Sequence, residues 1–335
     1  MKPKTDPPAG AWPEFPGFLY YEQERYAEHL QWTEKGLARD PDSSILHEQR
    51  FIYRALHGDW NRAWQDWEYR DIRRHLLKRF SRWPEWKGQP IPGTTLLVVG
   101  ELGIGDQIMF SRWLDKALLA SGAQRVFFAA RPELQRWNPA ARFGYGERLT
   151  TVPDQDDLPE FDFWTGLESL PLATRIPEPF PAGAARSAGN VRRVGICWHG
   201  DARVRVDSKR STRFSSWLAI LQTPGLIFRS LQQGECPDSR MEPLGPVTDI
   251  ADTARRMEDL DLVITVDTAI GHLAGAMGVP VWMLSYRPPE WRWGLAGEST
   301  NWYPSMRIFR QERRGEWDAV FARVQEELFV VAANG

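Results

Sequence analysis

The spacing of hydrophobic and polar residues changes near residue 90. Between residues 17 and 90 apolar side chains recur at helical intervals, which predicts a segment built from helices. From residue 91 onward short apolar runs alternate with amphipathic stretches, a pattern typical of parallel sheets covered by helices. The expected strands lie at 95–99, 125–129, 149–152, 193–198, 226–231, 262–266 and 281–284. The expected helices lie at 106–120, 132–137, 215–222, 250–257, 268–277 and 317–328.

A proline-rich stretch divides the strand-containing region. Residues 176–183 combine Pro, Gly and Ala between two alternating patterns, which is typical of an interdomain linker. Two parallel-sheet domains joined in this way leave a cleft between the carboxyl ends of their strands, where ligands bind. We therefore expect a flexible N-terminus at 1–16, a helical segment at 17–90, an acceptor-side α/β domain at 91–183 and a donor-side α/β domain at 184–335.

The helical segment contains an internal repeat. Tyr26 and Trp60 occupy equivalent positions 34 residues apart, as do Leu30 and Trp64, and 34 residues is the tetratricopeptide period. Two partial repeats are too few to bury a continuous core of their own, so we expect them to dock on the α/β domains. The pattern is compatible with a peptide-binding groove and with a plain helical cap.

Composition narrows the class of protein. The 335 residues carry a net charge of −2, which excludes a chain-wide basic surface for nucleic acid. Only two cysteines are present, Cys197 and Cys236, and this favours a reducing compartment. The N-terminus lacks the apolar core of a signal peptide, and no apolar run approaches the roughly 20 residues of a membrane span. We expect a cytoplasmic protein without a membrane span.

One local feature runs against the overall charge. Residues 70–82 are rich in arginine and lysine, with aromatic residues between them. Such a run can bind a polyanion, but it is also typical of a solvated helix face. Together with Arg203 and Arg205, it leaves a polyanionic acceptor such as DNA open.

The first candidate site is the glycine-rich turn at residues 100–106, which follows the first expected strand. Its glycines have the order G-x-x-G-x-G, with Gly103 and Gly105 close to Asp106. A dinucleotide loop needs G-x-G-x-x-G, and a carboxylate at the helix start would repel a pyrophosphate. The turn therefore disfavours a nicotinamide-dependent oxidoreductase. We interpret Asp106 as a catalytic base at the mouth of a parallel sheet.

The second candidate site follows the strand at 262–266. Thr268 is expected to open a helix whose free N–H groups and hydroxyl can bind a phosphate. Gly271 would let the protein backbone approach the ligand, and His272 lies in the next turn. Alternatively, Asp267 is only a helix cap and His272 a satisfied core histidine.

Further candidates lie at other strand ends of the second domain. Lys209 and Arg210 can neutralise a departing diphosphate, and Gln232 ends a strand where backbone groups can meet a base edge. Trp291 can form a wall for a sugar ring or pack in the core. The pair Asp259 and Asp261 precedes a buried strand, so we interpret it as a polar lead-in and expect no metal site.

The order of these motifs resembles the tetratricopeptide-linked glycosyltransferases, which are related to the ADP-heptose heptosyltransferases and, more remotely, to O-linked N-acetylglucosamine transferase. The motifs are Gly103-x-Gly105-Asp106, Trp198-x-Gly200, 207–211, 267–272, 291–293 and 302–304. The resemblance implies a GT-B fold with two facing Rossmann-like domains. It also implies inverting, metal-independent transfer from a nucleotide sugar such as a UDP-, ADP- or GDP-sugar, with no other cofactor.

The resemblance assigns roles to individual residues. An Asp matching Asp106 is the proposed base in the heptosyltransferases, and Lys209, Asp267, Thr268, Gly271 and His272 match residues around the donor. We add Arg210, Gln232 and Ala269 to the expected donor site. The expected positioning residues are Gly103, Gly105, Trp198, Gly200 and Trp291.

Acceptor recognition is the least defined part of the prediction. A protein side chain, a glycan and a hydroxymethylated DNA base all offer a hydroxyl. Asp201 stands where the relatives usually have Asn and places a negative charge near the donor. A non-catalytic module that binds a nucleotide sugar or a partner on the same fold is the alternative function.

Overall fold

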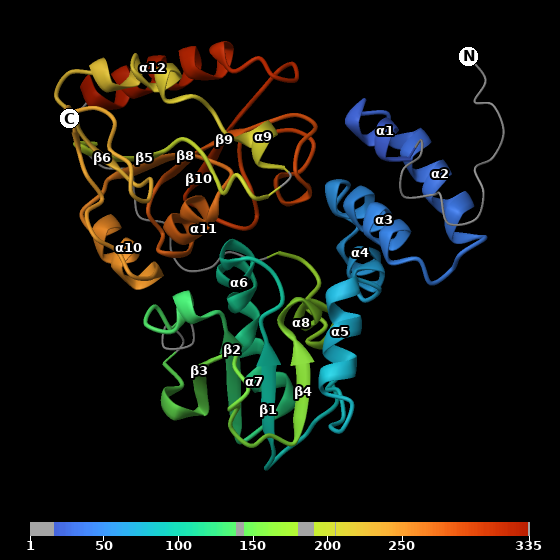
Figure 1. The fold of residues 1–335 in the computed structure, drawn as a ribbon. Coiled ribbons are helices and arrows are strands. Elements are labelled where there is room, and N and C mark those ends of the chain that lie inside the picture. The colour runs from blue at the N-terminus through green and yellow to red at the C-terminus, as the bar shows by residue number, and fades with distance from the viewer. Residues whose placement is uncertain (1–16, 139–143, 180–190, 205, 334–335) are drawn as a thin grey trace.

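The computed structural model describes residues 17–138, 144–179, 191–204 and 206–333. The chain begins with five helices: α1 (Gly17–Glu22), α2 (Tyr26–Leu37), α3 (Ser44–Leu56), α4 (Trp60–Trp67) and α5 (Asp71–Arg79). The first residues of α2 and α4 are Tyr26 and Trp60, the positions that defined the repeat. The helices form a column beside both sheets (Figure 1). Their assignment as tetratricopeptide repeats stays a prediction.

The first sheet is parallel and has the strand order β3-β2-β1-β4. Its strands are β1 (Thr95–Val99), β2 (Arg125–Ala130), β3 (Leu149–Pro153) and β4 (Phe163–Gly166). The α-helices of this half are α6 (Ile104–Phe110), α7 (Leu114–Ser121) and α8 (Leu170–Ala173). Its 3₁₀ turns are η2 (Ser111–Trp113), η3 (Pro132–Leu134), η5 (Gly146–Arg148) and η6 (Leu167–Ser169). The helix expected at 106–120 is therefore two helices with a 3₁₀ turn between them, and β4 was not expected.

The second sheet is also parallel and has the order β10-β9-β8-β5-β6-β7. Its strands are β5 (Arg193–Cys197), β6 (Ile227–Ser230), β7 (Met241–Glu242), β8 (Leu262–Val266), β9 (Val281–Ser285) and β10 (Met306–Arg310). Its helices are α9 (Asp207–Arg210), α10 (Ile250–Met257), α11 (Ala269–Ala276) and α12 (Asp318–Ala333). The 3₁₀ turns are η7 (Phe214–Trp217), η8 (Ile220–Gln222) and η9 (Trp291–Trp293). The helix expected at 215–222 is a pair of these turns, and β7 and β10 were not expected.

The two sheets confirm the predicted α/β class. Buried apolar strands such as β1 and β8, whose side chains are almost fully covered, are typical of parallel sheets with both faces covered. The start of α6 meets α11 at the junction of the two halves (Figure 1). The boundaries near residues 90 and 183 stay predictions, and residues 180–183 of the expected linker lie outside the described residues.

A cluster of aromatic side chains joins the helical column to both halves. Trp64 of α4 packs against Phe110, Trp113 and Trp291, with ring centroids 5.7, 6.4 and 6.2 Å away. Trp113 also donates its indole N–H to the carbonyl of Ile176 at 2.9 Å. Buried aromatic pairs of this kind add stability beyond the area they bury. The helices therefore dock on the α/β region, as we expected for a segment too short to bury a core of its own.

Candidate functional site

A cavity of about 840 Å³ lies between the two halves. The first half contributes the start of α6, and the second contributes the residues that follow β5, β6 and β8. Ten of the expected site residues line it: Gly103, Gly105, Asp106, Gly200, Arg210, Gln232, Asp267, Thr268, Ala269 and His272. The structure thus brings the two candidate motifs, which are about 160 residues apart in the sequence, to one cavity.

Gly105 is required by the close contact between the halves. A Cβ atom at this position would lie 2.9 Å from Cδ2 of His272 and 3.4 Å from Cα of Ala269. The first distance is shorter than packed carbon atoms tolerate. Gly103 has extended backbone angles and precedes the first turn of α6. The glycine spacing therefore serves helix packing and places Asp106 in the first turn of α6, beside α11.

Asp106 shares an arginine with a second carboxylate. Arg292 of η9 donates from Nη2 to Oδ1 of Asp106 and from Nη1 to Oε1 of Glu290. Burial is the main cause that raises the pKa of Glu290, to about 7, and the nearby Asp267 and Asp106 raise it further while Arg292 opposes them. The pKa of Arg292 is raised because its carboxylate neighbours outweigh the effect of burial. The guanidinium stays charged throughout.

The second motif forms the opposite wall. Thr268 is the N-cap residue of α11 and has an extended backbone, so the first N–H groups of the helix lie at the cavity. Asp267 is buried and accepts a hydrogen bond from the indole N–H of Trp293 at 3.0 Å. Burial raises its pKa. Asp267 is therefore not the helix cap; its carboxylate orients Trp293 instead.

His272 is a satisfied, buried histidine that also contacts the cavity. Its Nδ1 lies 3.0 Å from the hydroxyl of Tyr303, and its ring stacks on Trp293 with centroids 5.5 Å apart. Burial, assisted by nearby arginines, holds the pKa of His272 well below its usual range. The ring is therefore neutral near pH 7 and cannot neutralise a phosphate.

The residues after β5 and β6 complete the wall of the cavity. Arg210 donates from Nε to Asp207 at 3.1 Å, and a Cβ on Gly200 would lie 2.6 Å from Nη2 of Arg210. Gln232 accepts the backbone N–H of His199 at 3.2 Å. Gly200 therefore makes room for the guanidinium of Arg210, and Gln232 fixes the loop after β5.

Four expected site residues do not line this cavity. Lys209 forms an ion pair with Glu22 of α1, on the other side of α9. Trp198 packs on Phe214, with ring centroids 5.0 Å apart. A Cβ on Gly271 would lie 2.7 Å from Cε of Met283. Lys209 and Gly271 were expected at the donor and Trp198 as a positioning residue. In the structure these residues form an ion pair or pack against neighbouring side chains.

The fourth of these residues, Trp291, packs in the core, which is one of the two roles that the sequence left open. Its ring is 7% exposed and packs against Phe51 at 4.9 Å and against Trp64 and Trp302 at 6.2 and 6.0 Å between centroids. It is not the wall of a sugar site in the described structure. It holds η9 against the helical column, because its indole fills the space between α3, α4 and the residues near 302.

Glu290 and Arg292 were missed by the sequence analysis. For the run 290–294, the sequence indicated a role only for the tryptophans. The sequence signal for these two residues is an acidic and a basic side chain two positions apart within an aromatic run. This signal does not predict the partner of Arg292, because Asp106 lies 186 positions away. That contact depends on how the two halves meet.

Carboxylates outnumber arginines on the cavity wall, and each of its arginines is paired with a carboxylate. Among the described residues that line it are four arginines and six carboxylates. Asp201, the departure from the family pattern, pairs with Arg203, whose hydrogen bonds lower the pKa of Asp201 to about 2. The extra negative charge is therefore already partnered by a cation.

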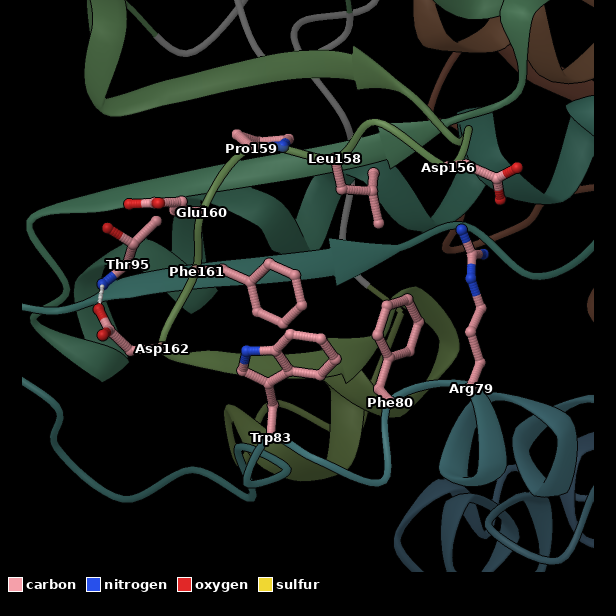
Figure 2. Close-up of a pocket in the computed structure, with 10 residues that line it drawn as sticks. All are labelled: Arg79, Phe80, Trp83, Thr95, Asp156, Leu158, Pro159, Glu160, Phe161 and Asp162. Carbon is pink, nitrogen blue, oxygen red and sulfur yellow. Dashed lines mark hydrogen bonds between the residues drawn. The ribbon is translucent and has the colours of Figure 1, made fainter.

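Three arginines of the basic run at residues 70–82 are paired with carboxylates in the fold. Arg70 pairs with Glu101, Arg73 with Glu85 and Arg79 with Asp154. A separate hollow of about 670 Å³ beside α5 is lined by aromatic rings and by Asp156, Glu160 and Asp162. Figure 2 shows the rings of Phe80, Trp83 and Phe161 turned toward one another there. These carboxylates disfavour a polyanion at this surface.

The described residues also bear on metal binding and on membrane insertion. Within the described parts of the chain, no group of three potential ligands is placed to hold a metal ion. Asp261 accepts the backbone N–H groups of Arg192 and Arg193, and Asp259 pairs with Arg229, as a polar lead-in to β8 would. Of the helices described, none has the length and apolar character needed to cross a membrane.

A segment of the second half, which carries part of the site, matches a known protein family. Residues 232–301 match the family described as glycosyltransferase family 9 (heptosyltransferase). This segment includes Gln232, Thr268, His272 and Arg292, whereas Asp106 lies outside it. The match confirms the predicted resemblance to the heptosyltransferases in this part of the chain.

A curated relative extends the similarity along the chain. Protein FlbA of Caulobacter vibrioides is 28% identical over 294 residues, which cover 74% of this chain and 48% of FlbA. The chain therefore spans about half the length of that relative.

Several solved structures have a remote likeness to the fold. The iron-containing dodecameric glycosyltransferase TibC of enterotoxigenic E. coli has a TM-score of 0.45 at 11% identity, covering 73% of this chain and 75% of its own. E. coli heptosyltransferase WaaC with ADP has a TM-score of 0.44 at 14% identity, covering 71% and 99%. An O-GlcNAc transferase mutant of Thermobaculum terrenum has a TM-score of 0.30 at 13% identity, covering 95% and 85%.

Proposed function

We propose that the chain is a GT-B glycosyltransferase that moves a sugar from a nucleotide sugar to an acceptor hydroxyl, with inversion and without a metal ion. The observation that carries the proposal is the shared cavity. Asp106 from the first half and the N-terminus of α11 from the second half line the same 840 Å³, a size typical of small-molecule sites. The family match over residues 232–301 supports the class of reaction.

The second half supplies the groups that suit the donor. The N–H groups at Thr268 and Ala269 carry the positive end of the α11 dipole, which attracts a phosphate. Arg210 lies on the same cavity and is 17% exposed. Together they would stabilise the charge that develops on a departing nucleoside diphosphate. Gln232 would keep the loop after β5 in place at the donor.

The first half supplies the proton acceptor. Asp106 stands at the start of α6, where packing against α11 fixes the backbone. Its carboxylate would remove the acceptor hydroxyl proton as the oxygen attacks the anomeric carbon. The rate gain would come from this proton transfer and from holding both substrates in one cavity.

The test begins with donor binding and then measures turnover. A panel of UDP-, ADP- and GDP-sugars is screened by thermal shift, because a ligand that binds only the folded state raises the melting temperature. The donor that binds is then assayed for release of nucleoside diphosphate in the wild type, Asp106→Asn and Asp115→Asn. Asp115 serves as the control, since it is a buried carboxylate of the same half that lies outside the cavity.

We expect Asp106→Asn to bind the donor and to lose about 10²- to 10⁴-fold in turnover, the usual contribution of a general base. Asp115→Asn should keep its turnover. Full activity of Asp106→Asn would contradict the role given to this residue, and a wild type that binds no nucleotide sugar would contradict the proposed function.

A non-catalytic module that binds a partner on the same fold is the second candidate. One observation favours it: Arg131, Arg203, Arg210 and Arg292 at the cavity are each already paired with a carboxylate. A diphosphate would have to compete with those partners. A folded protein that binds no nucleotide sugar in the thermal-shift screen would favour such a module.

A further inference from the structure

Two carboxylates from different halves of the fold meet on one guanidinium. Asp106 belongs to α6 of the first half, and Glu290 immediately precedes η9 of the second half. Arg292 lies between them and uses a different terminal nitrogen for each. Its side chain is 13% exposed, and those of Asp106 and Glu290 are 21% and 18% exposed. The cluster is therefore mostly screened from water but open to the cavity.

The guanidinium has little freedom to move. Its carbon lies 4.1 Å from the centroid of the Trp291 ring, and the backbone N–H of Arg292 donates to Oε2 of Glu290 at 2.8 Å. Trp291 is in turn locked against Phe51. On the other side of the loop, the hydroxyl of Tyr21 donates to the carbonyl of Pro289 at 2.9 Å. The helical column therefore determines where Arg292 stands.

The contact leaves one oxygen of Asp106 for chemistry. Arg292 donates to Oδ1, and within the described residues no donor is bonded to Oδ2. A carboxylate held at one oxygen keeps a fixed orientation and presents the other oxygen as the acceptor of a proton. General base catalysis depends on such placement, since a shift of about 1 Å can cost roughly 10²-fold in rate.

We propose, on the basis of the function proposed above, that Arg292, anchored by Glu290, is the positioning residue that orients Asp106 across the cavity. In the step it serves, the O–H bond of the acceptor breaks and Oδ2 of Asp106 takes the proton. The acceptor oxygen uses its electron pair to bond the anomeric carbon. The bond from that carbon to the donor phosphate breaks, and the nucleoside diphosphate leaves with the electron pair.

The charge of Glu290 makes the arrangement sensitive to pH. The groups that act on Glu290 are Tyr21 of α1, Asp106 of α6, Asp267 after β8, Tyr286 after β9 and Arg292 of η9. Burial, the largest cause, raises the pKa of Glu290 to about 7. Ionised Glu290 anchors Arg292 more strongly than the neutral acid does. The turnover of the wild type should therefore rise as the pH increases through about 7.

The test compares substitutions of the anchor with a matched arginine elsewhere. Arg229 of β6 is also 13% exposed and also bridges two carboxylates, Glu242 and Asp259, but it does not line the cavity. We expect Arg292→Met to lower kcat about 10- to 100-fold with a smaller change in the donor KM, and Arg292→Lys to recover part of the loss. Arg229→Met should keep the wild-type kcat. Glu290→Gln should lose the rise of turnover near pH 7.

A double-mutant cycle tests the contact without relying on turnover. The unfolding midpoints of Asp106→Asn, Arg292→Met and the double variant are compared, and we expect the effects to be non-additive because the two side chains touch. Additive effects, or an active enzyme whose kcat and pH profile survive Arg292→Met and Glu290→Gln, would overturn the positioning role alone. A wild type that turns over no nucleotide sugar, with non-additive midpoints, would instead overturn the proposed function and leave the contact established.

Discussion

Gly105→Ala probes the contact that assembles the cavity. The added Cβ would lie 2.9 Å from Cδ2 of His272 and 3.4 Å from Cα of Ala269. The imidazole has no room to retreat, because it stacks on Trp293 and lies 3.0 Å from the hydroxyl of Tyr303. The substitution must therefore push α6 away from α11 or distort the first turn of α11.

Two opposing terms set the size of the effect. Replacing a helical glycine by alanine gains roughly 0.5–1 kcal/mol of helix stability, whereas overpacking a filled site costs about 1–3 kcal/mol. The overpacking term is larger here because the atoms that the methyl meets are a buried ring and a backbone carbon. We expect a net loss of about 1–2 kcal/mol, which lowers the melting temperature of a chain this long by about 1–3 °C.

Thermal unfolding and turnover are measured on Gly105→Ala and on Gly17→Ala. Gly17 is a matched control because it starts a helix and, among the described residues, an added Cβ would meet only Oγ1 of Thr33, at 3.8 Å. Gly17→Ala should be as stable as the wild type or slightly more stable. The turnover of Gly105→Ala should fall even at temperatures where the variant is fully folded, since the displaced turn carries Asp106. A variant as stable and as active as the wild type would refute the packing argument.

Three further predictions concern stability. Trp291→Ala should lower the free energy of unfolding by about 3–5 kcal/mol, the usual loss for a buried large aromatic ring, as measured by chemical denaturation; a loss below about 1 kcal/mol would contradict its role in the aromatic cluster. Arg70→Met should cost about 3–5 kcal/mol because it leaves the buried Glu101 without its partner, whereas the exposed Arg74→Met should cost less than about 1 kcal/mol; equal losses would count against the buried pair. The pKa of His272 lies well below 6.5 in the folded chain, so the unfolded chain binds an extra proton and the free energy of unfolding falls as the pH drops through 6.5. His272→Gln should weaken this fall in denaturation curves measured at pH 7 and pH 5. An unchanged pH dependence would show that the ring titrates normally.

Strands that consist of an unbroken apolar run could be predicted from the sequence. β1 and β8 are apolar along their whole length and were found. β10 contains Arg307 and Arg310, whose side chains pair or bond at its edge, so its pattern resembles a polar segment. β4 has four residues and β7 has two, too few for a period to be visible. Length and edge position, which depend on the neighbouring strands, determine these cases.

The candidate site divides in the same way. Asp106 and Thr268 could be placed because each lies shortly after the end of a predicted strand, and parallel strands end at one edge of their sheet. The role of Arg292 could not be predicted, because its partner Asp106 lies in the other half and only the packing of the two halves brings the two side chains together. Lys209 was expected beside Arg210, but on a four-residue helix the two side chains point to different sides, and Lys209 meets α1. Local spacing does not contain this information.

In the proposed mechanism, Asp106 takes a proton from an acceptor hydroxyl while the α11 side of the same cavity holds the donor. The most direct test is NMR analysis of the product formed from a nucleotide sugar of known anomeric configuration, with wild type and Asp106→Asn. We predict an inverted anomeric centre with release of nucleoside diphosphate in the wild type and no product in Asp106→Asn. A product that retains the configuration, or the same product rate in Asp106→Asn, would contradict the claim.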